Sequence, residues 1–335
     1  MTEGAFIFGC EGPILSAREA AFFRETQPWG FILFGRNVES PAQLSVLTAS
    51  LRDSVGRDAP VLIDQEGGRV QRMGPPHWRS WLPALDQVAA APQAAARSMY
   101  LRFRLIAAEL RTAGIDVDCA PLADIAGVTT HPFLKNRCYG TDAAGVAEAA
   151  RAAADGLMAG GVLPVLKHIP GHGRATVDSH LDLPRVAAGL DELDASDFAP
   201  FRALADLPLG MTAHIVFDAV DRARPATASP DAIRLIRERI GFDGLLMTDD
   251  IAMQALAGNM AERTEAALAA GCDLVLHCNG VMSEMEAVAE AAGPLGSEAR
   301  VRAEAALAQR RVPDAVDLAV LDAELSGLIG RRALV

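Results

Sequence analysis

Eight short apolar segments recur along this chain, and longer segments of helical composition separate them. Each short segment is apolar at successive positions, as expected of a parallel strand that is buried on both faces. Several intervening segments begin at a capping residue or a proline and end at a glycine. Strand and helix thus alternate eight times, which favours an α/β fold of the (β/α)8 TIM-barrel type over an open doubly wound sheet. The predicted strands are residues 5–9, 30–35, 60–64, 115–121, 162–170, 209–217, 244–250 and 272–278.

The rest of the chain is predicted to be mainly helical. Predicted helices include 41–55, 84–113, 141–160, 230–240 and 260–270. The segment after residue 287 is expected to form extra C-terminal helices outside the barrel. No linker or shift in composition divides the 335 residues, so we predict a single domain over residues 1–335. Only 5% of residues are aromatic while half are apolar, which fits closely packed helices better than a β-sandwich.

Charge and cysteine content exclude several classes of function. A formal net charge of −12 repels phosphate backbones and anionic membrane surfaces, so neither nucleic acid nor a membrane is an expected partner.

The N-terminus lacks a basic region and a long apolar run, so it is not predicted to be a signal peptide, and we expect a cytoplasmic protein. The odd number of cysteines and the absence of a CxxC pair argue against disulfides or structural zinc. The cysteines are Cys10, Cys119, Cys138, Cys272 and Cys278.

Ionisable side chains gather at the predicted carboxyl ends of the strands. In a TIM barrel these ends form one face, where the active site lies. Long loops at 67–83, 126–139 and 171–184 follow three of the strands. Buried charges are costly unless they are paired or used, so the cluster indicates a site. Its members are Asp64, Lys167, His168, His214, Asp249, Asp250 and His277. We interpret His214 and His277 as packed structural histidines.

A carboxylate and an imidazole lie two residues apart in the third of these loops. In an extended segment the side chains of Asp178 and His180 point the same way. The carboxylate would fix the tautomer of the ring, whose pKa of about 6.5 suits proton transfer near neutrality. Asp249, at the end of a barrel strand, is a candidate nucleophile toward an anomeric carbon.

Other chemistries of these residues have weaker support. A metal site would use His168, His172, Asp178 and His180 as ligands. Because Pro170 and its neighbouring glycines make this segment a loop, the spacing does not favour metal, and we predict neither metal nor cofactor. Lys167 could instead form a Schiff base with a carbonyl substrate. The Gly-x-Gly of the same loop could bind a phosphate. Each of these hypotheses depends on a single sequence feature.

Four blocks of the sequence resemble glycoside hydrolase family 3, in its single-domain bacterial β-N-acetylglucosaminidase (β-hexosaminidase) branch. The blocks are LIDQEGGRVQR at 62–72, KNRCYG at 135–140, KHIPGHGRATVDSHLDLP at 167–184 and GLLMTDDIAM at 244–253. The third block is the most specific, and Ile169 departs from the aromatic residue expected there. The chain is too short for the additional α/β domain of the larger family members, which favours this branch over the β-glucosidases.

The resemblance implies a role for each matching residue. Asp249, and not Asp250, looks like the nucleophile, and His180 looks like the acid/base that Asp178 orients. The residues that match sugar-holding positions are Asp64, Arg72, Arg137, Lys167 and His168. Glycines in the segment 171–176 should let the loop carry His180 onto bound substrate.

The implied activity is retaining hydrolysis of a non-reducing terminal β-linked N-acetylglucosamine, through a covalent intermediate on Asp249. The implied substrates are muropeptides, small carbohydrates of peptidoglycan recycling in cell-wall metabolism. Three alternatives stay open. A phosphorylase would use phosphate as acceptor, since a histidine acid/base repels phosphate less than a glutamate. A non-catalytic sugar-binding barrel and a lyase dependent on Lys167 are the others. The sequence predicts neither oligomeric state nor aglycone preference.

Overall fold

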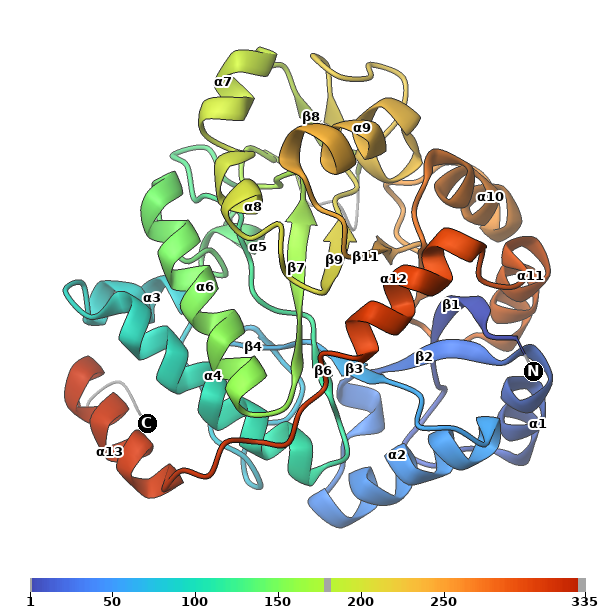
Figure 1. Ribbon diagram of the computed structural model, residues 1–335, viewed down its shortest axis with the longest axis horizontal. Coiled ribbons are helices and arrows are strands. Elements are labelled where there is room, and N and C mark those ends of the chain that lie inside the picture. The colour runs from blue at the N-terminus through green and yellow to red at the C-terminus, as the bar shows by residue number, and fades with distance from the viewer. Residues whose placement is uncertain (1, 178–181, 331–335) are drawn as a thin grey trace.

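Eight parallel strands close into a barrel, which confirms the predicted TIM-barrel fold (Figure 1). The computed structural model describes residues 2–177 and 182–330 of the chain. Closure is made by the first and last strands, with Phe6 paired to Val275 and Phe8 to His277. In order around the barrel the strands are β1 (Gly4–Gly9), β12 (Leu274–His277), β11 (Leu245–Asp250), β9 (Leu209–Thr212), β7 (Leu163–Ile169), β6 (Val117–Asp118), β3 (Val61–Ile63) and β2 (Pro28–Leu33).

Each predicted strand overlaps a barrel strand, but two predictions were too long. Of residues 115–121 only Val117–Asp118 is strand, and residues 209–217 divide into β9 and a separate β10 (Val216–Phe217). Strand β10 leaves the barrel and pairs with β8 (Arg185–Val186). A second small sheet is the hairpin of β4 (Gln65–Gly67) and β5 (Val70–Gln71), directly after β3.

The single helix predicted over 84–113 was wrong, because the segment forms α3 (Ala84–Ala90) and α4 (Ala95–Thr112). Pro92 interrupts it, since proline lacks an amide donor and disfavours helical geometry in the residue before it. Ala91 accordingly has φ −129° and ψ 57°.

The other predicted helices are confirmed with small changes in their bounds. Ser40 and Asn259 cap two of them with side-chain oxygens, as N-cap residues do. The segment 230–240 begins as α-helix and continues as a π-helical turn, Leu235–Ile240. Helices around the barrel include α1 (Ala17–Thr26), α2 (Pro41–Val55), α6 (Ala143–Ala159), α8 (Ala199–Ala203), α9 (Pro230–Arg234), α10 (Met260–Ala270) and α11 (Met282–Ala292), and α5 (Pro132–Lys135) and α7 (Leu190–Ala195) lie in loops.

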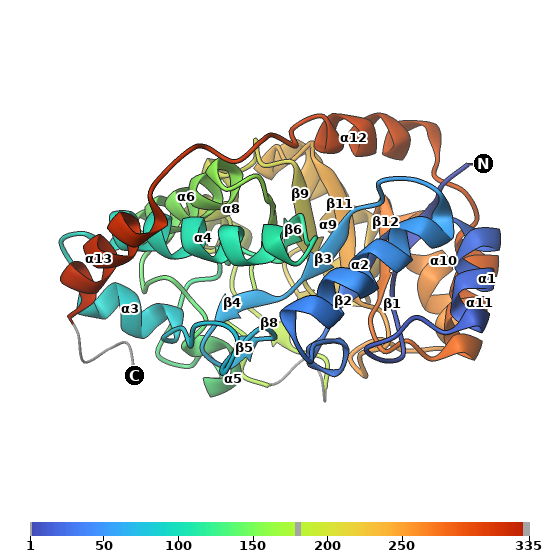
Figure 2. The same ribbon diagram turned by 90° about the horizontal axis from the view of Figure 1, so that it is seen from below.

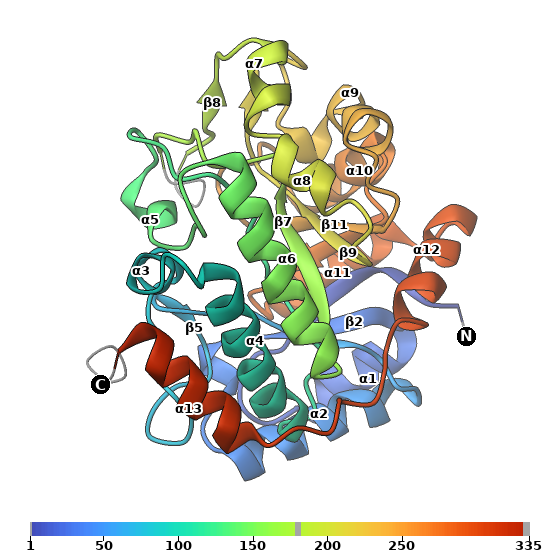
Figure 3. The ribbon, with the colours of Figure 1, turned by 60° about the vertical axis from the view of Figure 1, so that its left-hand side comes forward.

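The predicted C-terminal helices are α12 (Ser297–Leu307) and α13 (Leu318–Ile329). Helix α12 packs small side chains against the apolar side chains inside the barrel. Figure 2 places it at the opposite end of the barrel from α5 and the β4–β5 hairpin. Helix α13 lies against α4 on the outside (Figure 3). Among the described residues, no helix is long and apolar enough to cross a membrane.

Candidate active site

A cavity of about 400 Å³ opens at the carboxyl ends of the barrel strands. Six of the eight predicted site residues line it, namely Asp64, Arg72, Arg137, Lys167, His168 and Asp249. The other two, Asp178 and His180, lie outside the described residues. Apolar side chains such as Phe34 and Met211 form much of the remaining wall. The sequence therefore predicted which charged residues converge, while the apolar wall was not foreseen.

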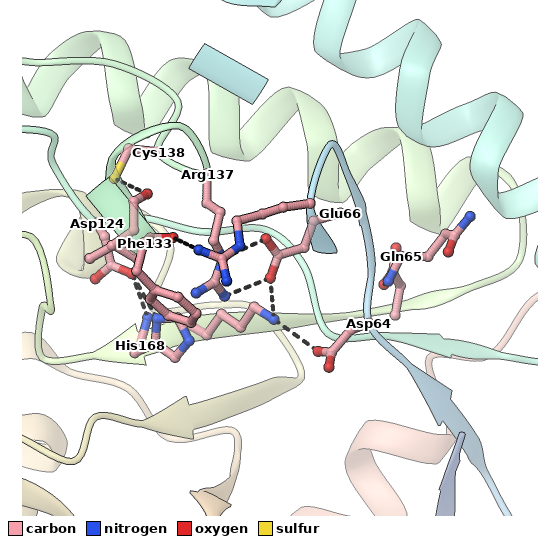
Figure 4. A network of polar contacts seen from close by, with 12 residues as sticks. Asp64, Gln65, Glu66, Asp124, Phe133, Arg137, Cys138 and His168 are labelled. Carbon is pink, nitrogen blue, oxygen red and sulfur yellow. Dashed lines mark hydrogen bonds and ion pairs between the residues drawn. The ribbon is translucent and has the colours of Figure 1, made fainter. Parts of the chain in front are cut away.

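Lys167 lies at the centre of an ion-pair network on one wall of the cavity. Its Nζ atom is 3.1 Å from Oδ1 of Asp64 and 2.6 Å from Oε1 of Glu66. Arg72 donates from Nη2 to Oδ2 of Asp64 over 2.8 Å. Arg137 donates from Nε and Nη2 to the two oxygens of Glu66, at 2.9 and 2.8 Å (Figure 4). The network fixes both arginines and the lysine before any sugar binds.

Sequence reasoning missed Glu66, although a signal was available. It lies two residues after Asp64 in an extended segment, so the two carboxylates share a face. Glu66 is only 2% exposed and makes two-point contact with Arg137. A buried carboxylate of this kind is a positioning group for the cations around it.

Electrostatics keep this wall ionised at neutral pH. Burial alone would raise the pKa of Asp64, but Lys167 and Arg72 hold it well below its usual range. Burial would lower the pKa of Lys167, yet Asp64 and Glu66 raise it above its ordinary value. An amine must lose its proton to attack a carbonyl, so this environment opposes the Schiff-base role considered for Lys167.

His168 is oriented by a second carboxylate that the sequence analysis did not single out. Its Nδ1 lies 2.8 Å from Oδ2 of Asp124 (Figure 4). The amide of His172 donates to Oδ1 of Asp124 over 2.6 Å. Burial opposes ionisation of Asp124, but the two histidines lower its pKa. The carboxylate therefore holds the Nδ1–H tautomer of His168. The signal for Asp124 was its place just after the fourth barrel strand.

The two neighbouring acids at the end of β11 have different environments. The Asp249 carboxylate lines the cavity, and its Oδ1 accepts the amide of Asp250 over 2.8 Å. Burial would raise the pKa of Asp249, but His168, His214 and this hydrogen bond lower it. Asp250 instead accepts the amides of Ala252 and Cys278 with Oδ1, at 3.1 and 3.2 Å. Both acids line the cavity, but Asp250 binds two loop amides, whereas among the described residues the Asp249 carboxylate accepts only the amide of Asp250.

Two further histidines at the strand ends are fully buried, and neither lines the cavity. His214 contacts Thr227 through Nδ1 at 2.7 Å and the carbonyl of Asp250 through Nε2 at 3.0 Å. The Nε2 atom of His277 lies 2.9 Å from Glu284. Within the described ranges, no three His, Cys, Asp or Glu side chains are arranged to hold a metal ion.

Comparison with known proteins places this geometry among the glycosidases. The N-terminal domain of glycosyl hydrolase family 3 matches residues 15–312. A beta-hexosaminidase of Methylococcus capsulatus is 39% identical over 306 residues, covering 89% of this chain and 90% of that protein. A beta-hexosaminidase of Pseudomonas aeruginosa is 36% identical over 281 residues, covering 83% of each.

Solved structures are similar over nearly the whole chain. NagZ from Neisseria gonorrhoeae, in complex with N-trifluoroacetyl-D-glucosamine, superimposes with a TM-score of 0.85 at 30% identity, covering 98% of this chain and 99% of that one. A family 3 β-N-acetylglucosaminidase from Paenibacillus has a TM-score of 0.87 at 29% identity and covers 97% of this chain and 67% of its own.

Proposed function

Because the chain belongs to glycosyl hydrolase family 3, we propose that it is a retaining exo-β-N-acetylglucosaminidase with Asp249 as its nucleophile. It is a glycosidase of the β-hexosaminidase type. One observation carries the mechanistic proposal: Asp249 is kept ionised in a cavity that residues of the Lys167 network also line. A carboxylate facing an array of fixed hydrogen-bonding groups suits attack on a bound sugar.

In the proposed reaction the Asp249 carboxylate attacks the anomeric carbon as the bond to the leaving oxygen breaks. His180, oriented by Asp178, gives a proton to that oxygen and later takes one from the water that releases the sugar. Two displacements at one carbon restore its configuration. A histidine thus replaces the second carboxylate that most retaining glycosidases use.

The sugar would be held by the charged wall. Asp64 accepts hydrogen bonds from hydroxyl groups, while Arg72, Arg137 and Lys167 donate them and His168 uses its remaining ring nitrogen. Their mutual ion pairs support this role, because the groups need little rearrangement when a sugar enters. As positive charge develops on the ring, its hydroxyls become better donors, so the hydrogen bonds that the Asp64 carboxylate accepts strengthen.

The proposed substrates are muropeptides with a non-reducing terminal β-linked N-acetylglucosamine, within cytoplasmic peptidoglycan recycling. The N-acyl glucosamine bound to the NagZ structure supports the sugar. The muropeptide and the cytoplasmic setting depend on the resemblance of the four sequence blocks.

The first test is hydrolysis of an aryl β-N-acetylglucosaminide beside the matching β-glucoside, without added metal. We expect release from the first substrate and little from the second. Asp249→Asn should lower kcat at least about 1,000-fold, while calorimetry still detects N-acetylglucosamine binding. Asp250→Asn is the matched control and should lose far less activity.

Two results would contradict this assignment. Normal turnover by Asp249→Asn would show that Asp249 is not the nucleophile. A rate that requires inorganic phosphate and yields sugar 1-phosphate would replace hydrolysis by phosphorolysis.

A further inference from the structure

One histidine of the cavity wall has no hydrogen-bond partner for its ring nitrogens in the described part of the chain. His172 is 5% exposed and lines the cavity. Neither Nδ1 nor Nε2 has a hydrogen-bond partner among residues 2–177 and 182–330. Leaving a buried polar group without a partner costs about 1–3 kcal/mol. Such a group in the wall of a cavity is explained when a ligand supplies the partner.

The position of this ring is fixed by the chain around it. The amide of His172 is bound to Asp124, the same carboxylate that orients His168, and the two ring centroids are 5.6 Å apart. On the far side, the carbonyl of His172 accepts the amide of Ala175 over 3.0 Å. A side chain at Gly173 would collide with Ile125, because a Cβ there would lie 2.1 Å from its carbonyl oxygen. The imidazole is therefore presented by a closely packed turn.

The ring is neutral at physiological pH. Burial, with a contribution from His168, lowers the pKa of His172 to about 4. A neutral imidazole has one N–H donor and one acceptor nitrogen. A sugar hydroxyl also both donates and accepts, whereas the ionised groups of the same cavity can each do only one of these. The neutral ring thus complements a hydroxyl without adding charge.

We propose that His172 is a further sugar-binding residue of this site, whose ring hydrogen-bonds to one hydroxyl of the terminal sugar. The proposal rests on the proposed function, because it takes the ligand to be a β-N-acetylglucosaminide. It gives Asp124 a double task, since one carboxylate would position two imidazoles that touch the same sugar.

The test compares His172→Leu, His172→Asn and His172→Gln on an aryl β-N-acetylglucosaminide and its 3-, 4- and 6-deoxy analogues. His172→Leu should lower kcat/KM about 10- to 100-fold on the parent sugar. On the analogue that lacks the contacted hydroxyl, His172→Leu and the wild type should have the same kcat/KM. Asn places a polar atom near Nδ1 and Gln near Nε2, so rescue by one of them identifies the ring nitrogen. His77→Leu, at an exposed position, is the control and should match the wild type.

Stability gives an independent readout. Because His172→Leu removes a buried ring without a hydrogen-bond partner among the described residues, the melting temperature should stay the same or rise. A loss of kcat/KM that is equal on all four sugars would overturn the proposal, since the ring would then act on the protein and not on a hydroxyl.

The same variants separate this proposal from the proposed function. If the wild-type protein hydrolyses none of the substrates, the proposed function fails, and calorimetry with N-acetylglucosamine and its deoxy forms still tests His172. The contact would be supported if His172→Leu bound N-acetylglucosamine more weakly than the wild type but bound one of the deoxy sugars with the same affinity as the wild type. Unchanged affinity for every sugar would overturn it.

Discussion

The carboxylates of the site differ in charge because their partners differ. Asp64 and Glu66 form ion pairs with Lys167, whereas Asp118, the last residue of β6, forms no ion pair among the described residues. Its Oδ1 accepts the amide of Gln65 over 3.0 Å, and its Oδ2 has no partner among the described residues. Burial, with repulsion from Asp64 and Glu66, raises the pKa of Asp118 to about 7.

Asp118 should therefore make stability fall as pH rises. The pKa is about 7 in the folded state and near 3.8 when unfolded, so between these values the folded state holds a proton that the unfolded state has lost. Asp118→Asn keeps the acceptor for Gln65 and removes the titration. Its free energy of unfolding relative to the wild type should rise by a few kcal/mol from pH 5 to pH 8, at about 1.4 kcal/mol per pKa unit.

Urea unfolding at several pH values measures this difference. Asp86→Asn, at an exposed position, is the control and should show no such slope. A difference between Asp118→Asn and the wild type that does not change with pH would contradict the assignment.

For single residues, the sequence predicts which side chains come together at the cavity, but not which of them form ion pairs and hydrogen bonds with one another. Asp64, Lys167 and Asp249 were found because ionisable groups at strand ends share one face of a barrel. Glu66 and Asp124 were missed because their importance comes from partners about 70 and 44 positions away in the chain. Asp178 and His180 stay predictions.

At the scale of elements, a side chain of the β4–β5 hairpin binds the backbone of the loop that follows it. Gln71 donates from Nε2 to the carbonyls of Met73 and Arg79, at 2.9 and 2.6 Å, and its Oε1 accepts the amide of Trp81 over 3.0 Å. It therefore holds the loop that follows Arg72. Two-residue strands such as β5 have too little periodicity for prediction, whereas the longer apolar barrel strands were recognised.

Gln71→Leu should loosen this loop and misplace Arg72. The Arg79 carbonyl and the Trp81 amide lose the hydrogen bonds from Gln71, while the Met73 carbonyl keeps the one from Gln65, so the melting temperature should fall. The apparent KM should rise about 10-fold with a smaller change in kcat, because Arg72 would bind the sugar and not react with it. Steady-state kinetics and thermal unfolding of the same preparation measure both effects.

Gln43→Leu is the matched control. Gln43 also accepts one amide, from Glu39, and donates to two carbonyls, of Pro13 and Asn37. It should lose stability without the rise in KM. Equal changes in KM for the two variants would show that the effect of Gln71 is not transmitted through Arg72.

At the scale of the whole molecule, the two ends of the barrel have different tasks. The cavity occupies the carboxyl ends of the strands, and α12 closes the other end, where Ala299, Ala303 and Ala306 pack with barrel side chains. Small side chains let the helix approach closely. The sequence predicted helices after residue 287 but placed them only on the outside, because composition does not reveal which surface a helix covers. The single domain over residues 1–335 stays a prediction.

This division predicts that stability and substrate binding can be changed separately. Ala303 is 2% exposed against the barrel floor, so Ala303→Glu would bury a charge without a partner and should cost about 3 kcal/mol or more. Ala305→Glu makes the same change on the exposed face of the helix, and its free energy of unfolding should stay within about 0.5 kcal/mol of that of the wild type.

At a temperature where Ala303→Glu is still folded, its KM should equal that of the wild type, since the cavity lies at the opposite end. Urea unfolding and kinetics on the same samples measure both quantities, and a raised KM with unchanged stability would mean that the barrel floor and the cavity are coupled.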